Sequence, residues 1–350
     1  MTQAWLIRAG KAGEREQWAL ENGVSGGGFH EVPDLTPATT REAVTALVAE
    51  AFPGSKDGRI QNFSAQLWAL RERINSGDLV VMPLKDSPHL AIGRVTGGYQ
   101  YRDDENPALR HVRPVEWIVT DTPRTAVKQD LLYSLGAFLT ICEVKRNDAV
   151  HRIAALASNG SDPGARPGKG SAGSAHHEAE DEPVDPDTPQ IDLEQYAFDR
   201  LSTYVIEKFA GYRMQRLVAA ILEAEGFTCR VPPEGPDQGV DVLAGTGPFG
   251  MDAPRLVVQV KSEAGAVGSP VVGQLLGAMS RHQTTQGLLV AWGGVTKPAE
   301  QLLAAEHFRL RVWSSKELLE AIFRNYDRLS DEVRSELPLK RIWTVVEEAG

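Results

Sequence analysis

The sequence predicts two domains, an α+β domain followed by an α/β domain. The chain has 350 residues, 42% of them hydrophobic, which is enough for two ordinary cores. Residues 158–195 hold very few large apolar side chains and separate two regions that are rich in them. Beyond this segment, strand patterns alternate with helix patterns, as is typical of a sheet with parallel pairs and flanking helices. We therefore expect domains at residues 1–157 and 196–350.

Composition argues against a membrane or secreted protein. No apolar run approaches the length of a membrane-spanning helix, and the N-terminal sequence MTQAWLIRAG does not resemble a signal peptide. The two cysteines, Cys142 and Cys229, are far apart and form neither a metal-ligand spacing nor a disulfide framework, so we expect reduced, buried thiols. These features predict a cytoplasmic protein without a membrane partner.

The acidic charge is concentrated in the segment between the domains. The net charge is −10, but residues 158–195 alone hold nine acidic and two basic residues. The flanking domains are close to neutral, so charge neither supports nor excludes DNA binding. Because the segment is rich in Gly, Ser and Pro, it predicts a flexible acidic linker. We expect the pair His176 and His177 to be solvated side chains rather than a metal site.

The first domain reads as a small mixed sheet with helices at its edges. A helix at 59–74 follows from apolar residues at helical spacing, and one at 39–52 from the possible N-caps Thr39 and Thr40. Runs rich in β-branched residues indicate the strands. The expected elements are a strand at 4–9, helices at 39–52 and 59–74, strands at 77–84, 89–102 and 111–119, and a largely helical region at 125–157.

The second domain reads as helices alternating with strands. Its clearest element is an amphipathic helix at 211–227 that ends at Gly226. The expected elements that follow are strands at 239–245 and 255–262, a helix at 270–282, a strand at 287–294, a helix after Thr296, and a strand at 309–313.

Polar residues interrupt two neighbouring apolar strands of this domain. Asp241 lies in GVDVL, and Gln259 and Lys261 lie in VVQVK. Gln259 and Lys261 are two residues apart, so they project from the same face of their strand, whereas Val258 and Val260 project towards a core. If the two strands pair as a hairpin, Asp241 lies beside Gln259 and Lys261.

A carboxylate, an amide oxygen and an ammonium group at one sheet edge suit phosphodiester hydrolysis. Asp241 and Gln259 would supply oxygen ligands to Mg²⁺ (or Mn²⁺), whose remaining ligands would be water and phosphate. The metal would lower the pKa of a bound water. Lys261 would orient that water or neutralise charge in the transition state.

The order LVAAILEAEGF, PDQGVDVLAG, LVVQVKS, GQLLGAM and QGLLVAWGG is similar to Mrr-type restriction endonuclease domains of the PD-(D/E)XK superfamily. The resemblance covers roughly residues 211–325. It implies a restriction-endonuclease-like fold with a central mixed sheet flanked by helices, and a D…QXK site made of Asp241, Gln259 and Lys261. Gln274 matches a polar position on the following helix. Gln215 stands where many members carry a glutamate, and Asp237 is a further candidate.

Each of these residues also has a structural interpretation. Asp241 could be a turn residue, and Lys261 could be a strand-end lysine that keeps the sheet edge soluble. Gln274 could be an ordinary surface residue. A domain that binds DNA without cutting it would carry a similar pattern.

The stretches AWLIRAG, QLWALRERINSGDLVVMP, AIGRVTGGYQY and HVRPVEWI resemble the small PUA-like barrels of the EVE type over about residues 1–120. Such domains are thought to read modified bases in DNA. The resemblance implies a pocket, because aromatic rings beside hydrogen-bonding groups can hold a flipped base. Its candidate lining comprises Trp5, Phe29, Asn62, Gln66 and Trp68. The alternative is that the tryptophans belong to the core.

Together these features predict a Mg²⁺-dependent endonuclease for restriction of foreign double-stranded DNA, possibly DNA with modified bases. Cutting both strands needs two sites, so we expect a homodimer or a transient dimer. A second hypothesis is a non-catalytic DNA-binding or sensor module of a defence system. A third is a nuclease that acts on RNA or is gated by a nucleotide signal.

Overall fold

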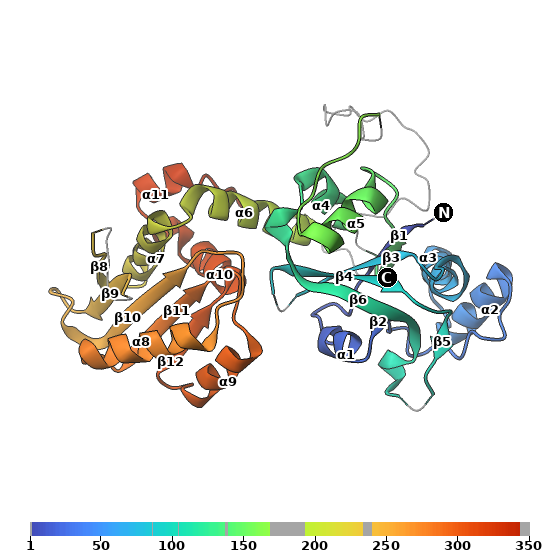
Figure 1. The fold of residues 1–350 in the computed structure, drawn as a ribbon, viewed down its shortest axis with the longest axis horizontal. Coiled ribbons are helices and arrows are strands. Elements are labelled where there is room, and N and C mark those ends of the chain that lie inside the picture. Colours follow the sequence, from blue (N-terminus) through green and yellow to red (C-terminus); the bar gives the residue numbers. More distant parts are fainter. Residues whose placement is uncertain are drawn as a thin grey trace. The chain divides into compact units, whose positions relative to one another are not determined.

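The computed structural model describes residues 2–85, 87–103, 105–136, 139–168, 193–233 and 240–343 (Figure 1). The chain divides between Asp199 and Arg200 into two compact units. Within the described ranges, no helix combines the length and apolar character that a membrane crossing requires.

The first unit is built on one curved, seven-stranded sheet. The strands follow the order β2-β6-β4-β3-β1-β7, and β5 pairs with β6. Because β2 and β7 stand at opposite ends of this order, the described strands form a half-barrel and not a closed barrel. The strands are β1 (Ala4–Ile7), β2 (Val24–Gly26), β3 (Leu79–Pro83), β4 (His89–Val95), β5 (Gln100–Tyr101), β6 (His111–Pro123) and β7 (Ile141–Glu143).

Helices cover both faces of this sheet. One core cluster joins β1, β3 and β4 to α4 and α5, and another packs α2 and α3 together beside the sheet. The Thr40 side chain accepts a hydrogen bond from the Ala43 backbone N–H, so Thr40 is the N-cap of α2. The helices are α1 (Glu16–Glu21), α2 (Arg41–Ala51), α3 (Asp57–Trp68), which continues as a π-helical turn (Ala69–Arg73), α4 (Gln129–Leu135) and α5 (Ala149–Asn159).

The expected elements of the first unit are present, with corrections. The strand expected at 89–102 is two strands, because the chain turns at residues 96–99. The region expected to be helical at 125–157 contains β7 between its helices, and the sequence patterns missed α1 and β2. These elements have six residues or fewer, which is too short for a periodic pattern to reveal.

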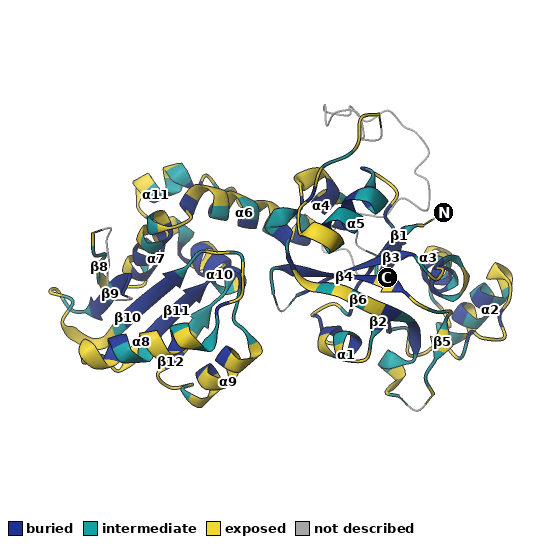
Figure 2. Ribbon diagram, in the orientation of Figure 1, coloured by how far each residue is buried: buried dark blue, intermediate teal, exposed yellow. Residues whose placement is uncertain are grey.

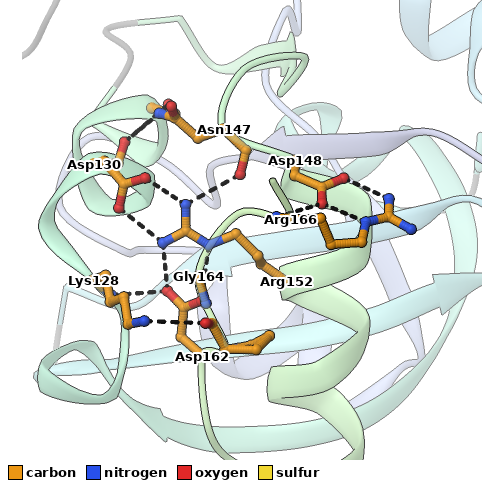
Figure 3. Close-up of polar contacts among 10 residues, drawn as sticks. Lys128, Asp130, Asn147, Asp148, Arg152, Asp162, Gly164 and Arg166 are labelled. Atoms are coloured by element: carbon orange, nitrogen blue, oxygen red, sulfur yellow. Dashed lines mark hydrogen bonds and ion pairs between the residues drawn. The ribbon is translucent and has the colours of Figure 1, made fainter. Parts of the chain in front are cut away.

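A buried ion-pair cluster holds residues 160–166 on the first unit (Figure 3). The fully buried Arg152 of α5 donates to Asp130 at 2.6 Å and to Asp162 at 2.7 Å. Asp162 also accepts the Lys128 backbone N–H at 2.9 Å. The start of the expected linker, at residues 158–168, is therefore packed in place. Residues 169–192, which include His176 and His177, lie outside the described residues.

A mixed five-stranded sheet forms the centre of the second unit, in the order β12-β11-β10-β9-β8. The strands β10, β11 and β12 are parallel, whereas β8, β9 and β10 are antiparallel neighbours. The hairpin expected between the two polar-bearing strands is β9–β10, and the expected parallel pairs are confirmed. The strands are β8 (Thr228–Arg230), β9 (Val242–Thr246), β10 (Asp252–Lys261), β11 (Gln286–Ala291) and β12 (Leu310–Trp313).

Helices on both faces bury the middle of this sheet. In Figures 1 and 2, α7 and α10 lie on one side and α8 and α9 on the other, and the central strands between them are buried. Amphipathic α7 buries Met214, Leu217, Val218, Ile221 and Leu222. The predicted α/β fold is thus observed. The helices of this unit are the end of α6 (Leu193–Phe209), α7 (Tyr212–Ala224), α8 (Ser269–Arg281), α9 (Lys297–Ala305), α10 (Ser315–Asn325) and α11 (Asp331–Glu336).

Candidate active site

Asp241 lies at the buried start of β9, where its carboxylate bridges a helix and a strand. The side chain of Gln215, on the first turns of α7, donates to Oδ1 at 2.6 Å. The backbone N–H of Val260 in β10 donates to Oδ2, also at 2.6 Å. Asp241 is 6% exposed and its own N–H donates to Val258. Asp241, in the bend just before β9, is therefore buried and hydrogen-bonded to β10 and is not in an exposed turn.

Gln259 and Lys261 flank the residue that binds the Asp241 carboxylate. Val260 lies between them in β10, so the hairpin brings Asp241 to this stretch, as the sequence predicted. Gln259 is 1% exposed, and its Oε1 atom is buried without a hydrogen-bond partner. Lys261 ends β10, is half-buried, and makes no ion pair within the part of the chain that the structure describes.

Both faces of β10 are buried, which corrects one expectation. The sequence placed the core on the side of Val258 and Val260, away from Gln259. Both valines are buried, but Val257, on the same face as Gln259, also packs in a core cluster with α8 and β11. The reason is that β10 is a central strand with helices on both sides. Gln259 thus lies on the face of β10 that α8 covers. Of the side chains Val257, Gln259 and Lys261 on this face, only Lys261, at the end of the strand, reaches solvent.

The first turn of α7 is fixed next to the end of β10. Gly211, the N-cap of α7, donates its backbone N–H to the Ser262 hydroxyl at 2.9 Å. Gly211 has a φ of +70°, a conformation that favours glycine. This contact places the start of α7 beside Ser262, the residue that follows Lys261. No sequence pattern indicated Ser262, because its role depends on the tertiary fold.

One other candidate, Gln274, is not brought into this site by any contact of the described residues. Gln274 is exposed on α8, whose buried residues include Val272 and Leu275. Within the described residues, no hydrogen bond joins the Gln274 side chain to Asp241 or Lys261. Asp237 lies outside the described residues.

The oxygen atoms at the site suit a hard divalent cation. The Asp241 carboxylate supplies a charged oxygen, and Gln259 Oε1 supplies a buried oxygen that no donor satisfies. In the described ranges, no three His, Cys, Asp or Glu side chains are grouped as they would be in an all-protein cage. Asp241 and Gln259 therefore fit Mg²⁺, which usually keeps several water or phosphate ligands.

In the first unit, Trp5 and Gln66 have structural partners. Trp5 is fully buried and donates from Nε1 to the Asp78 carboxylate at 3.1 Å, with the Arg73 guanidinium over its ring. Gln66 is 5% exposed and accepts the Ile141 backbone N–H at 2.9 Å, which ties α3 to β7. Neither side chain faces an open pocket in this state.

The remaining first-unit candidates divide between two packing regions. Phe29 packs edge-on against Phe63, with ring centroids 5.3 Å apart, and Trp68 packs in the same α2–α3 cluster. Asn62 accepts a hydrogen bond from Gln66 at 2.7 Å. Trp5 belongs to a second cluster, under β1 and β3, and Phe29 packs against this cluster as well. Phe29 thus joins the two clusters, and the base pocket expected from these five residues stays a prediction.

Comparisons with known proteins point to a nuclease for the second unit. Residues 206–322 match the Mrr catalytic family, described as restriction endonuclease, and residues 5–134 match DUF8426, a domain of unknown function. No curated protein matches the chain. Residues 206–322 thus form a restriction endonuclease domain, whereas the EVE-like resemblance of the first unit stays a prediction.

Solved structures with some similarity include three proteins. The MspJI restriction endonuclease in complex with a 27-mer oligonucleotide is 13% identical, over 91% of this chain and 75% of that one, with a TM-score of 0.32. The DNA modification-dependent restriction endonuclease AspBHI is 12% identical, over 90% and 87%, with a TM-score of 0.31. AF1548, a protein of unknown function, is 21% identical, over 36% and 76%, with a TM-score of 0.26.

Proposed function

We propose that this protein is a Mg²⁺-dependent DNA endonuclease that restricts foreign DNA. The observation that carries the proposal is the placement of the Asp241 carboxylate at Val260, between Gln259 and Lys261, inside a restriction endonuclease domain. A buried carboxylate, an unsatisfied amide oxygen and an unpaired ammonium group at one strand end are costly for stability alone. Their neighbouring positions on the β9–β10 hairpin support a site for phosphodiester hydrolysis.

Each residue has a distinct task in this proposal. Asp241 and Gln259 hold the divalent metal, Mg²⁺ or Mn²⁺, which when bound makes water a better nucleophile and neutralises phosphate charge. Gln215 fixes the Asp241 carboxylate through its 2.6 Å hydrogen bond. The Lys261 ammonium orients the attacking water or stabilises negative charge on the phosphate in the transition state.

The finer part of the proposal concerns the choice of DNA. The first unit would read the DNA, in the sharper version a modified base, and the second unit would cut at some distance from it. This version is motivated by the EVE-like sequence resemblance of residues 1–120. Cleavage of both strands of a duplex would engage two copies of the chain, as a homodimer or a transient dimer.

Plasmid cleavage in the presence of Mg²⁺ tests the enzyme. Wild type is expected to nick or linearise the plasmid, whereas Asp241→Ala and Lys261→Ala remove activity and still bind DNA. Lys316→Ala is the matched control, because Lys316 is an exposed lysine on α10 of the same unit. Full activity of Lys261→Ala would exclude the role proposed for this lysine.

A panel of DNA substrates tests the reader. Plain, methylated, hydroxymethylated and glucosylated DNA of one sequence are compared for cleavage rate. Preferential cutting of one modified form is expected. Equal cutting of all four would reject modification reading without affecting the nuclease.

A non-catalytic DNA-binding or sensor module is the alternative function. The observation that favours it is the small number of charged ligands, because Gln215 and Gln259 both stand where carboxylates would bind metal more tightly. Under this alternative, wild type, Asp241→Ala and Lys261→Ala all shift DNA in gels, and none cuts it with Mg²⁺ or Mn²⁺.

A further inference from the structure

Three arginines and two aromatic rings lie in neighbouring segments of the first unit, two of the arginines against the rings. Arg15 immediately precedes α1, and Trp18 lies one turn further along that helix. The Arg102 guanidinium lies over the Trp18 ring, 5.7 Å from its centroid. The Arg110 guanidinium lies 6.0 Å from the centroid of Tyr101. We call Arg15, Trp18, Tyr101, Arg102 and Arg110 the arginine face.

A glycine loop connects the two parts of this face. Gly28 donates its backbone N–H to Ala108, in the connection between β5 and β6 that also carries Arg110. The preceding residue, Gly27, lies against Arg15: a Cβ atom there would be 2.8 Å from Arg15 Nε. Gly27 also has a φ of +84°. A larger residue at 27 would displace the guanidinium, so the loop holds Arg15 in place.

Arg15 is a buried cation with little compensation. It is 9% exposed, and its Nε atom is buried without a hydrogen-bond partner. Its ion pair is with Glu14 at 3.6 Å, and that carboxylate is 54% exposed. Desolvation lowers the pKa of Arg15, and Glu14 only partly opposes this effect. A buried charge whose one ion pair is long and reaches an exposed carboxylate is only partly compensated, so an anion at the outer edge of this guanidinium would be bound favourably.

Arg102 and Arg110 extend the positive charge beyond Arg15. Both are half-buried, and neither makes an ion pair within the described part of the chain, although Asp103 and Glu105 lie in the same connection. Among the described residues, their side chains contact aromatic rings and, for Arg110, the Glu105 carbonyl oxygen. Guanidinium groups that stack on rings keep N–H donors available for phosphate oxygens.

We propose that the arginine face binds phosphate groups of the DNA backbone, with Arg15 as its buried anchor. The inference rests on the proposed function, since it takes DNA as the ligand of the first unit. Backbone contacts carry no sequence information, but they fix the orientation and register of a protein on a duplex. The face would thus position DNA on the first unit whichever base is read.

The salt dependence of DNA binding tests this proposal. The full chain carrying Lys261→Ala, which prevents cleavage, is titrated with an unmodified duplex at a series of salt concentrations. Adding Arg102→Ala or Arg15→Gln is expected to weaken binding equally for all sequences. Each change should also make the negative slope of log K against log salt less steep by about one. Arg146→Ala is the matched control, because Arg146 is an exposed arginine of the same unit outside the arginine face. It should leave the slope unchanged.

The remaining outcomes separate this inference from the proposed function. Unchanged slopes for both variants, in a chain that still binds DNA, would overturn the arginine face and leave the nuclease intact. A wild-type chain that neither binds nor cuts DNA would overturn both. Arg102→Ala removes a half-buried side chain, so it keeps the test valid if Arg15→Gln unfolds. If inorganic phosphate stabilises the chain through Arg15 but the DNA slopes do not change, the site binds free oxyanions and the DNA assignment is wrong.

Discussion

Replacing Gln215 with alanine should reduce cleavage without unfolding the nuclease unit. The Gln215 side chain donates to Asp241 Oδ1 at 2.6 Å, a hydrogen bond to a charged acceptor. Such bonds contribute about 1.5–3 kcal/mol. Asp241 keeps its hydrogen bond from the Val260 N–H, so the variant loosens the carboxylate without releasing it.

The expected effect on rate follows from that energy. If the bond is needed to orient Asp241 in the transition state, its loss lowers kcat/KM by about 10- to 150-fold, since about 1.4 kcal/mol corresponds to a factor of ten. The assay is plasmid cleavage over a series of Mg²⁺ concentrations, with the unfolding temperature measured in parallel. Because Gln215 acts through Asp241, the Mg²⁺ concentration for half-maximal activity should also rise.

Gln215→Glu provides a sharper version of the same test. It places a second carboxylate beside Asp241, so the metal-free variant should be less stable than wild type, and Mg²⁺ should stabilise it more. This change is measured as a shift in unfolding temperature, independently of activity. If Gln215→Ala cuts within about twofold of wild type with the same Mg²⁺ dependence, Gln215 does not position Asp241 for catalysis.

Three further predictions concern stability and packing. Burial raises the pKa of Asp162, but hydrogen bonds from Arg152 and two backbone N–H groups outweigh this effect and leave the pKa below its ordinary value. The resulting stability is present above the unfolded-state pKa of about 4 and is lost as pH falls through the lower folded-state pKa. Asp162→Asn should therefore lower the free energy of unfolding by about 3 kcal/mol at neutral pH. In urea unfolding, the variant should also lose less of its free energy of unfolding than wild type as the pH falls, and equal pH profiles of the two chains would contradict this. Burial raises the pKa of the Cys142 thiol to about 12, so iodoacetamide should label it in urea but not in the native chain, and rapid native labelling would be inconsistent with this. Trp5→Phe removes the hydrogen bond to Asp78 and should cost about 1–2 kcal/mol with no change in discrimination between plain and modified DNA. Loss of discrimination without loss of stability would instead make Trp5 a base reader.

The candidate site was predictable where it depends on local alternation. Strand period alone puts Gln259 and Lys261 on one face, and a short hairpin brings Asp241 to them. The hydrogen bond from Gln215 and the anchor at Ser262 were not predictable in this way. They join α7 to the sheet across 26 and 51 residues, and a single sequence does not reveal such contacts.

In the first unit, residue type was a poor guide to function. Trp5 and Gln66 looked suited to a base pocket, yet both satisfy their polar groups within the protein. Arg15 showed no sign in the sequence of being special, because its isolation depends on Gly27 and on burial. A large aromatic residue is more often needed by a core than by a ligand, whereas a buried guanidinium with an unsatisfied N–H group is unusual in any fold.

Gln259 carries the strongest argument for function in the second unit. Its neighbours on the same face of β10 and β11, Val257 and Leu289, are buried in an apolar cluster, so valine or leucine at 259 would be the stable choice. An unsatisfied buried amide oxygen costs about 1–3 kcal/mol. A role in packing alone would leave the Gln259 amide oxygen unsatisfied. As a metal ligand, the same oxygen would be bound by Mg²⁺, which would supply the missing partner. Gln259→Leu should therefore raise the unfolding temperature of the metal-free chain and abolish its stabilisation by Mg²⁺. A variant that is less stable than wild type without metal would mean that Gln259 is kept for the fold and not for the site.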